Sequence, residues 1–276
     1  MTLEDVAWKA YELFSAPSSF QRLENPVFSD KLRDLRNMFH RVQLSDLKYD
    51  EAKLNRLKKK SDMIWYMSIV DHEEDEMLQG DQEDNHTPAA VMTIAAFLLK
   101  PGARLPIHNH PKMYGIMKVL HGQLKLQSYS SVKCLDSTSK GRMPQLLVRK
   151  SDAQSVTPDI YPLLIHRNNG DVHEVCNETD EMAVFIDILA PPYDFRIPNG
   201  AEQTHAHRYV SYYRELGPAS PDVLKAATLE NVPRTSKSDH GRIKETENYY
   251  VLEEIKCPDW YETEHLEYEG PSLNRR

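Results

Sequence analysis

The chain has 276 residues, which is enough for one large domain or two small ones with a sizeable buried core. Forty-two acidic residues against 34 basic ones give a net charge of −8, which disfavours a nucleic-acid partner because a phosphate backbone would be repelled. Apolar stretches such as Val91 to Leu99 are too short to cross a bilayer, so no membrane partner is expected. The three cysteines include no CxxC pair, which argues against a disulfide framework and against a thiolate zinc site. We therefore expect a cytoplasmic protein.

Helical patterns occupy the first part of the chain. Residues 2 to 15 carry an apolar stripe at helical spacing, and Thr2 and Asp5 have the spacing of a capping box. A second amphipathic pattern follows Ser29, and its apolar face is expected to pack against its own domain rather than against a partner. The triplet Lys58 to Lys60 is interpreted as solvated surface, with a nuclear localisation signal as the weaker alternative. Residues 1–62 are thus predicted to be a helical extension that packs on the rest of the chain.

Strand patterns dominate from about residue 63 onward. Short segments rich in apolar, aromatic and β-branched residues are separated by Gly, Pro, Asn and Ser clusters, as in a β-sandwich or barrel. The predicted strands are residues 63–70, 91–99, 116–120, 123–129, 182–189, 209–216 and 249–255. Segments 134–152 and 218–247 are polar and weakly patterned, and the run 71–84 is acidic, so all three are predicted to be loops. Residues 63–276 are therefore expected to form a mostly β domain.

The most informative residues are His108 and His110, which follow an apolar strand and lie between two prolines. In an extended strand, residues i and i+2 project from the same face, so both imidazoles can bind one metal ion. A second HxH pair, His205 and His207, lies in a polar segment and carries less weight.

This stretch resembles the first motif of the cupin superfamily, G(x5)HxH(x4)E(x6)G. Gly102, His108, His110 and Gly122 all fall in register, whereas Gly115 stands at the glutamate position. The resemblance implies a double-stranded β-helix, which is a jelly-roll barrel, preceded here by the N-terminal helices.

The second cupin motif supplies a third imidazole. Gly170, His173 and Asn177 match its G(x2)H(x3)N half, which makes His173 the expected third ligand. His166, seven residues upstream, is the competitor that spacing alone would not exclude.

Three imidazoles without a carboxylate change what a bound metal can do. Neutral ligands leave the full charge of a divalent ion in place, so an anionic thiolate gains Coulomb energy by binding, and the ion lowers the thiol pKa. The set also disfavours the oxygenase site built from two histidines and one carboxylate. Three protein ligands leave positions open, which is typical of catalytic metal sites.

Longer motifs resemble the thiol dioxygenases, the family of cysteamine dioxygenase and the plant cysteine oxidases. The segments that carry the resemblance are residues 106–122, residues 183–194, Ser211 to Arg214, and the tail 259–271. The resemblance implies Fe(II), O2 as co-substrate, and oxidation of a thiol to a sulfinic acid. The implied substrates are cysteamine and proteins or peptides that begin with cysteine, whose oxidation can direct them to an N-degron pathway that senses oxygen.

Three further residues are assigned by this resemblance. Asp187 lies in an otherwise apolar strand and is expected to accept a hydrogen bond from a ligand imidazole, most simply His173, with a peripheral salt bridge as the alternative. Tyr193 and Tyr212 match tyrosines near the family's pocket, where a phenol could contact bound oxygen or the substrate amine; either could instead be a packed core aromatic.

Two positions depart from the family pattern. Ser211 stands where close relatives have cysteine, so a Cys-Tyr thioether cannot form there. Lys112 replaces the usual glycine after His-Pro and is expected near the pocket mouth.

Two kinds of protein are the alternatives to a thiol dioxygenase. One is a cupin oxygenase or isomerase with nickel, manganese or zinc, and the other is a non-catalytic cupin that binds a partner. A monomer is expected.

Overall fold

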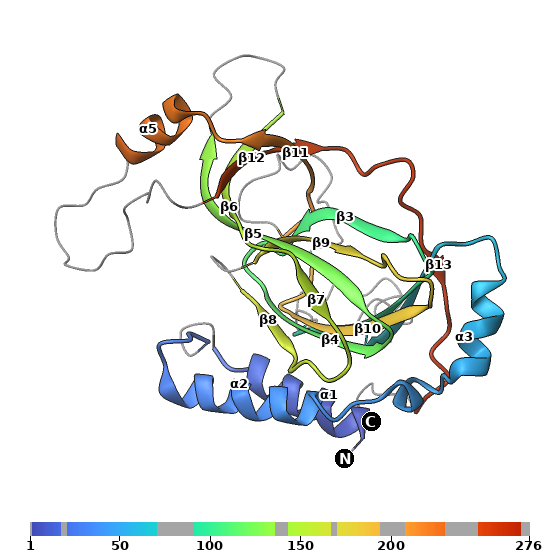
Figure 1. Cartoon of the computed structure of the whole chain (residues 1–276). Helices are drawn as coiled ribbons and strands as arrows, with labels where there is room; N and C mark the ends of the chain where they lie inside the picture. Colours follow the sequence, from blue (N-terminus) through green and yellow to red (C-terminus); the bar gives the residue numbers. More distant parts are fainter. Residues whose placement is uncertain are drawn as a thin grey trace, which may run out of the picture.

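The fold combines N-terminal helices with a barrel of two facing sheets (Figure 1). The computed structural model describes residues 2–17, 21–70, 91–135, 143–166, 170–193, 208–229 and 248–271. The acidic run 71–84 and the pair His205 and His207 lie outside the described residues. No helix within the described ranges is long and apolar enough to cross a membrane.

Helix α1 (Leu3–Phe14) forms where the apolar stripe predicts it, and its capping box is present. The Asp5 backbone N–H donates to Thr2 Oγ1 at 3.3 Å, and the Thr2 N–H donates to Asp5 Oδ2 at 2.7 Å. Helix α2 (Pro26–Phe39) begins earlier than predicted, because Asn25 caps it and Pro26 supplies a first-turn residue with a suitable φ. Sequence analysis missed the short helix α3 (Glu51–Lys58), which follows the 3-10 turn η1 (Leu44–Leu47).

The described strands form two sheets. Sheet 1 has the order β13-β1-β2-β10-β4-β8, and sheet 2 has the order β6-β12-β11-β3-β9-β5-β7. The strands of sheet 1 are β1 (Ile64–Val70), β2 (Thr93–Leu99), β4 (Tyr114–His121), β8 (Leu163–Ile165), β10 (Ala183–Ala190) and β13 (Glu264–His265). Those of sheet 2 are β3 (Arg104–Asn109), β5 (Leu124–Leu135), β6 (Gln145–Lys150), β7 (Gln154–Val156), β9 (Val172–Cys176), β11 (Tyr212–Pro218) and β12 (Tyr249–Ile255). The prediction of a mostly β barrel with N-terminal helices is confirmed.

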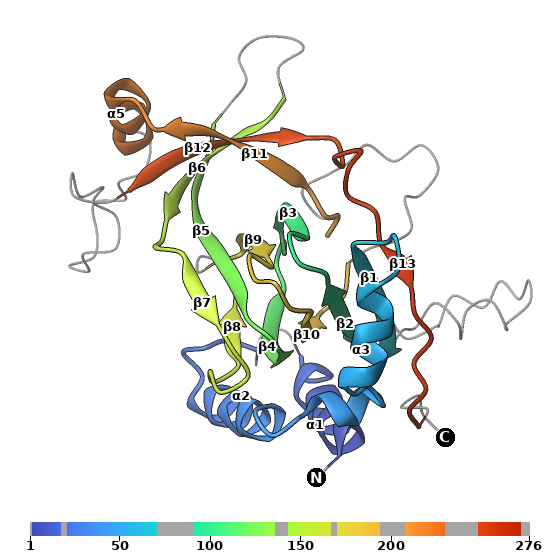
Figure 2. The same cartoon turned by 45° about the vertical axis from the view of Figure 1, so that its right-hand side comes forward.

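Two predicted loops contain regular structure. The segment 134–152 includes the end of β5 and all of β6, which pair with each other and place Leu147 and Val148 at 0% exposure. Its short apolar run between charged residues is the signal that was missed. The segment 218–247 includes helix α5 (Pro221–Leu229), which lies at the end of the long ribbon made by β6, β11 and β12 (Figure 2).

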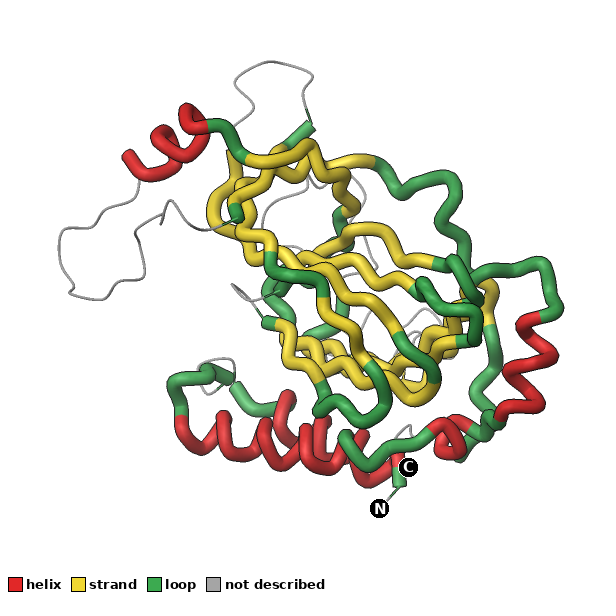
Figure 3. The backbone as a smooth tube through the Cα atoms, viewed as in Figure 1, coloured by secondary structure: helices red, strands yellow, loops and turns green. Residues whose placement is uncertain are grey.

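Helices α1 and α2 cover one side of the barrel, as the tube view shows (Figure 3). Apolar residues of α1 and α2, including Val6, Phe28 and Phe39, share one core with the outward face of sheet 1. Each such side chain, fully buried, contributes about 1.5 to 3 kcal/mol. A second core, which includes Leu105 and Phe185, fills the space between the two sheets below the site described next.

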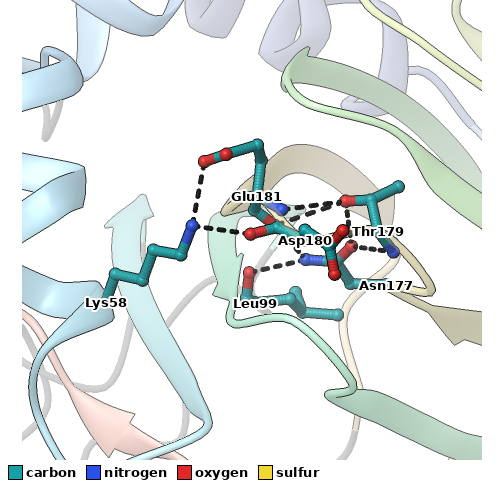
Figure 4. Close-up of polar contacts among 6 residues, drawn as sticks. All are labelled: Lys58, Leu99, Asn177, Thr179, Asp180 and Glu181. Carbon is teal, nitrogen blue, oxygen red and sulfur yellow. Dashed lines mark hydrogen bonds and ion pairs between the residues drawn. The ribbon is translucent and has the colours of Figure 1, made fainter.

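The motif asparagine Asn177 is structural and organises the turn between β9 and β10 (Figure 4). Its amide donates to the carbonyls of Leu99 at 3.1 Å and Glu181 at 2.7 Å, and its Oδ1 accepts from Thr179. Lys58 of α3 reaches the same turn and donates to the Asp180 carbonyl at 2.6 Å. The buried amide therefore replaces backbone pairing where the chain passes from one sheet to the other.

Candidate metal centre

The middle of sheet 2 brings two of the three histidines into one row. His108 of β3 lies opposite His173 of β9 on one side and opposite Tyr212 of β11 on the other. The register of β3 against β9 shifts between Leu105 and His108, which indicates a bulge directly before the first histidine. His110 follows the end of β3, and its backbone N–H donates to the Asp171 carbonyl at 2.8 Å.

The three imidazoles converge on one point inside the barrel. One ring nitrogen from each of His108, His110 and His173 lies within 4.8 Å of the other two. The ring centroids are 5.0, 4.7 and 4.8 Å apart, so each ring contacts both of the others. His110 and His173 are 3% and 4% exposed. The structure thus contains a buried three-histidine triad of the kind that binds a metal.

The outer nitrogens of the rings have partners that fix the tautomers. His108 Nδ1 lies 2.8 Å from the Pro106 carbonyl, and His173 Nδ1 lies 3.3 Å from the Gly170 carbonyl. A carbonyl oxygen only accepts, so each Nδ1 carries the proton and donates it. The Nε2 lone pairs of both rings are therefore available to a metal.

Tyr193 fixes the third ring in the same way. Its hydroxyl donates to the Asn109 carbonyl at 2.7 Å and lies 2.8 Å from His110 Nδ1. Because the single hydroxyl hydrogen is used by the carbonyl, the phenol oxygen accepts from the His110 Nδ1–H. All three histidines then present unprotonated Nε2 atoms, and those of His110 and His173 are 3.3 Å apart.

The donor chemistry fits a cation. Burial, together with the adjacent His108, lowers the pKa of His173 to about 3. Burial also lowers the pKa of His110 well below 6.5, with contributions from the other two imidazoles, and burial lowers the pKa of His108. Neutral imidazoles with facing lone pairs repel one another unless a positive ion lies between them, and imidazole suits iron, zinc, copper and nickel.

The glutamate position of the motif is held by a glycine in tightly packed surroundings. Gly115 pairs with Ile165 of β8 and Leu189 of β10. A Cβ added there would lie 3.2 Å from side-chain atoms of both neighbours. A larger residue would require those side chains to shift by a few tenths of an ångström, and with glycine at this position the donor set is three neutral nitrogens.

A cavity of about 370 Å³ opens beside the triad, and its walls are mainly apolar and aromatic. Among the lining residues that the structure describes, Asp187 of β10 carries the one carboxylate, and no lysine or arginine is present. Burial raises the pKa of Asp187 from 3.8 to about 7. In the described part of the chain, no side-chain hydrogen bond reaches this carboxylate. The expected bond to His173 is absent, because His173 Nδ1 contacts the Gly170 carbonyl instead.

The two tyrosines that the sequence singled out both line the cavity but differ in their contacts. Tyr193 contacts a triad imidazole, as described above. The Tyr212 hydroxyl interacts with the thiol of Cys257, and burial together with that thiol raises the pKa of Tyr212 to about 12. Tyr193 is thus placed to orient the imidazole of His110, whereas sequence analysis expected it to contact bound oxygen or the substrate amine, or to pack in the core.

Other candidate residues lie apart from the triad. His166, at the end of β8, is not among the grouped metal-binding side chains of the described residues, and its ring lies 6.5 Å from that of Tyr114. Lys112 is not among the described lining residues of the cavity, although it was expected near its mouth. The thiol of Cys176, at the end of β9, is half-buried, and burial raises its pKa to about 12.

Sequence analysis missed the aromatic walls of the cavity. Tyr66, Phe97, Phe185 and Tyr261 all line it. Alternate residues of a strand share a face. The sequence signal was therefore the alternation of residues 93, 95 and 97 on β2 and of 185, 187 and 189 on β10, all of which face the cavity.

Comparison with known proteins places the chain in a family. The sequence matches the PCO_ADO family over residues 84–273. The 2-aminoethanethiol dioxygenase of Homo sapiens is 26% identical over 233 residues, which are 76% of this chain and 74% of the human protein. Plant cysteine oxidase 2 of Arabidopsis thaliana is 25% identical over 181 residues, which are 66% of this chain and 56% of the plant protein.

Solved structures are similar over a smaller part of the chain. A cupin superfamily protein from Desulfitobacterium hafniense is 10% identical and has a TM-score of 0.28, over 48% of this chain and 80% of the other. The family match covers more than half of the sequence and includes all three histidines of the triad. The chain therefore belongs to the PCO_ADO family of thiol dioxygenases.

Proposed function

We propose that this protein is an Fe(II)-dependent dioxygenase that oxidises the thiol of cysteamine or of an N-terminal cysteine to a sulfinic acid. The reaction combines R–SH with O2 to give R–SO2H, so both oxygen atoms enter the product and no other reductant is needed. The observation that carries the proposal is the convergence of three unprotonated Nε2 atoms beside a cavity with one described carboxylate. Iron held by His108, His110 and His173 would supply the redox chemistry by which O2 reacts with sulfur.

The protein's own contribution to sulfur chemistry is electrostatic. The three imidazoles are neutral, so they leave the positive charge of a bound metal uncompensated. A cysteine-derived thiol that enters such a site loses its proton more readily, because the thiolate is stabilised by the nearby cation. The apolar walls strengthen this effect by excluding water.

Asp187 is the group that we assign to the substrate amine. Cysteamine and an N-terminal cysteine both carry an ammonium group two carbons from sulfur, and Asp187 lies in the same cavity as the triad. A buried carboxylate without a hydrogen-bond partner is costly, so an ammonium group that pairs with it gains more than it would at the surface. This pairing would place the sulfur toward the metal and the amine toward sheet 1.

The experiment is anaerobic loading of purified protein with Fe(II), followed by exposure to air with cysteamine or a Cys-initiated peptide. Mass spectrometry should show an increase of 32 Da, and loading with Ni(II), Mn(II) or Zn(II) should not support it. His173→Ala should lose turnover, whereas His166→Ala, a histidine outside the triad, should retain it. Unmodified cysteamine and peptide with the iron-loaded protein would reject the proposal.

We also propose that residues 63–276 form the catalytic domain of a cytoplasmic, monomeric enzyme and that residues 1–62 cover it. The shared core of α1, α2 and sheet 1 supports a covering role, because its apolar residues would otherwise contact water. A chain that begins at residue 63 should consequently aggregate or lose stability; a stable, monomeric truncated protein would contradict this role.

A further inference from the structure

A row of aromatic rings crosses sheet 1 next to Asp187. Phe185 lies opposite Phe97 in the pairing of β10 with β2, and Phe97 lies opposite Tyr66 in the pairing of β2 with β1. The two phenylalanine rings are stacked at 5.0 Å with an angle of 13° between them, and the Tyr66 ring meets Phe97 at 5.2 Å. One row further along the strands, Asp187 lies opposite Ala95, whose small side chain leaves space beside the carboxylate.

A second aromatic surface belongs to the same cavity. Tyr212 and Tyr261 both line it, with ring centroids 6.0 Å apart. Tyr212 lies opposite His108, so this surface continues directly from the triad. Although they lie within the barrel, Tyr66, Phe97 and Tyr261 each keep part of their surface accessible, which indicates an unfilled space between aromatic walls.

The cavity is larger than the smallest substrate requires. Cysteamine has four non-hydrogen atoms, which occupy roughly 120 Å³ if each takes about the 30 Å³ of a liquid water molecule. The cavity measures about 370 Å³. A substrate with several more atoms beyond the amine would fill it, as binding sites generally enclose most of their ligand.

We infer that the space between these walls binds the second residue of a Cys-initiated peptide and selects a neutral aromatic or branched aliphatic side chain there. This inference rests on the proposed function, because the cysteine thiol must face the triad and its amine must face Asp187. The peptide bond then leads away from Asp187, and the next side chain is the group within reach of the Phe185, Phe97 and Tyr66 row.

The charge of the cavity gives the inference its specificity. The described walls contain no lysine or arginine, so an acidic second residue would lose its hydration, would find no cationic side chain to pair with, and would be repelled by Asp187. A basic second residue would compete with the terminal amine for that same carboxylate. A neutral apolar side chain has neither disadvantage and buries its surface against aromatic rings.

The test compares Cys-Phe-Gly, Cys-Leu-Gly, Cys-Gly-Gly and Cys-Asp-Gly peptides on the iron-loaded protein. We expect kcat/KM to be roughly 10- to 100-fold higher for the first two than for Cys-Gly-Gly, and lowest for Cys-Asp-Gly. Phe97→Ala, or Phe97→Leu if the first variant does not fold, should reduce the preference for Cys-Phe-Gly. Leu98→Val is the matched control, because Leu98 is the next residue of β2 and packs in the core on the opposite face. The ratio of two peptides on one variant cancels any loss of folded protein.

A binding measurement keeps the inference testable apart from catalysis. Calorimetry on the metal-free protein with Ser-Phe-Gly and Ser-Gly-Gly should show at least about tenfold tighter binding of the first. Equal binding, or equal turnover of Cys-Phe-Gly and Cys-Gly-Gly, would overturn the inference and leave the proposed function standing. Preferential binding of Ser-Phe-Gly without turnover of any thiol would support the side-chain site and reject the proposed function instead.

Discussion

We predict that the hydroxyl of Tyr193 supports metal binding by His110. Tyr193→Phe removes the atom that lies 2.8 Å from His110 Nδ1 and 2.7 Å from the Asn109 carbonyl. The imidazole then loses the contact that keeps its proton on Nδ1, and the tautomer with a protonated Nε2, which cannot bind metal, becomes accessible. Loss of a hydrogen-bond partner behind a metal-binding histidine weakens metal affinity by about 10- to 100-fold, which corresponds to about 1.4 to 2.8 kcal/mol.

The assay is titration of the metal-free protein with Fe(II) under anaerobic conditions, or with Co(II), in competition with a chromophoric chelator. Tyr212→Phe is the matched control, because it removes a phenol hydroxyl from the same cavity whose partner is the thiol of Cys257. We expect that control to retain the affinity of the unmodified protein. Equal affinities for Tyr193→Phe and the unmodified protein would refute the reasoning that this hydroxyl fixes the tautomer of His110.

Three further predictions concern stability, measured by urea unfolding of the metal-free protein. Burial raises the pKa of Asp187 from 3.8 to about 7, so the folded state binds this proton more tightly than the unfolded state does. The free energy of unfolding should therefore decline as pH rises from about 4 to about 7. Asp187→Asn should remove this decline, and a variant that keeps the decline would show that Asp187 is not its source. Asn177→Ala should lower the free energy of unfolding by about 2 to 4 kcal/mol because it leaves buried partners unpaired, whereas Thr179→Ser keeps its hydroxyl bonds; equal losses would count against the role of the amide. Lys112 and Lys48 have φ angles of 58° and 61°, in the left-handed region that is strained for residues with a Cβ atom. Because glycine adopts this region without strain, Lys112→Gly and Lys48→Gly should each raise the free energy of unfolding by about 0.5 to 1 kcal/mol. A decrease at both positions would show that the left-handed conformation is not costly there.

Where the relevant interactions are local, the sequence predicted the structure well. The capping box of Thr2 and Asp5 marked the start of α1, because both partners lie within one helical turn. The start of α2 was misplaced because the cap formed by Asn25 and Pro26 was not recognised as a start signal. The β6 strand was missed for a different reason. Its short apolar run is flanked by polar residues, so the local pattern does not indicate burial. The run is buried because β6 pairs with both β5 and β12, two strands that are far from each other in the chain.

The candidate site shows the same division. Alternation along a strand placed His108 and His110 on one side, and the motif spacing singled out His173 over His166, so the histidines that the structure brings together could be named from the sequence. The sequence could not say which group each outer ring nitrogen contacts. Tyr193 contacts His110 although it lies 83 residues away in the chain. The expected bond between Asp187 and His173 is not formed, because His173 Nδ1 contacts the Gly170 backbone carbonyl.

The sequence by itself determined the residue types, the local faces of helices and strands, and the set of neutral donors. The tertiary structure decided which faces meet. The row of Phe185, Phe97 and Tyr66 exists because β10, from a distant part of the chain, pairs in register with β2, which pairs with β1. Periodicity assigns a side chain to a face, whereas register and sheet packing determine its neighbours, and these depend on burial summed over the whole barrel. The shape and charge of the cavity beside the triad are therefore properties of the fold, and no single segment contains them.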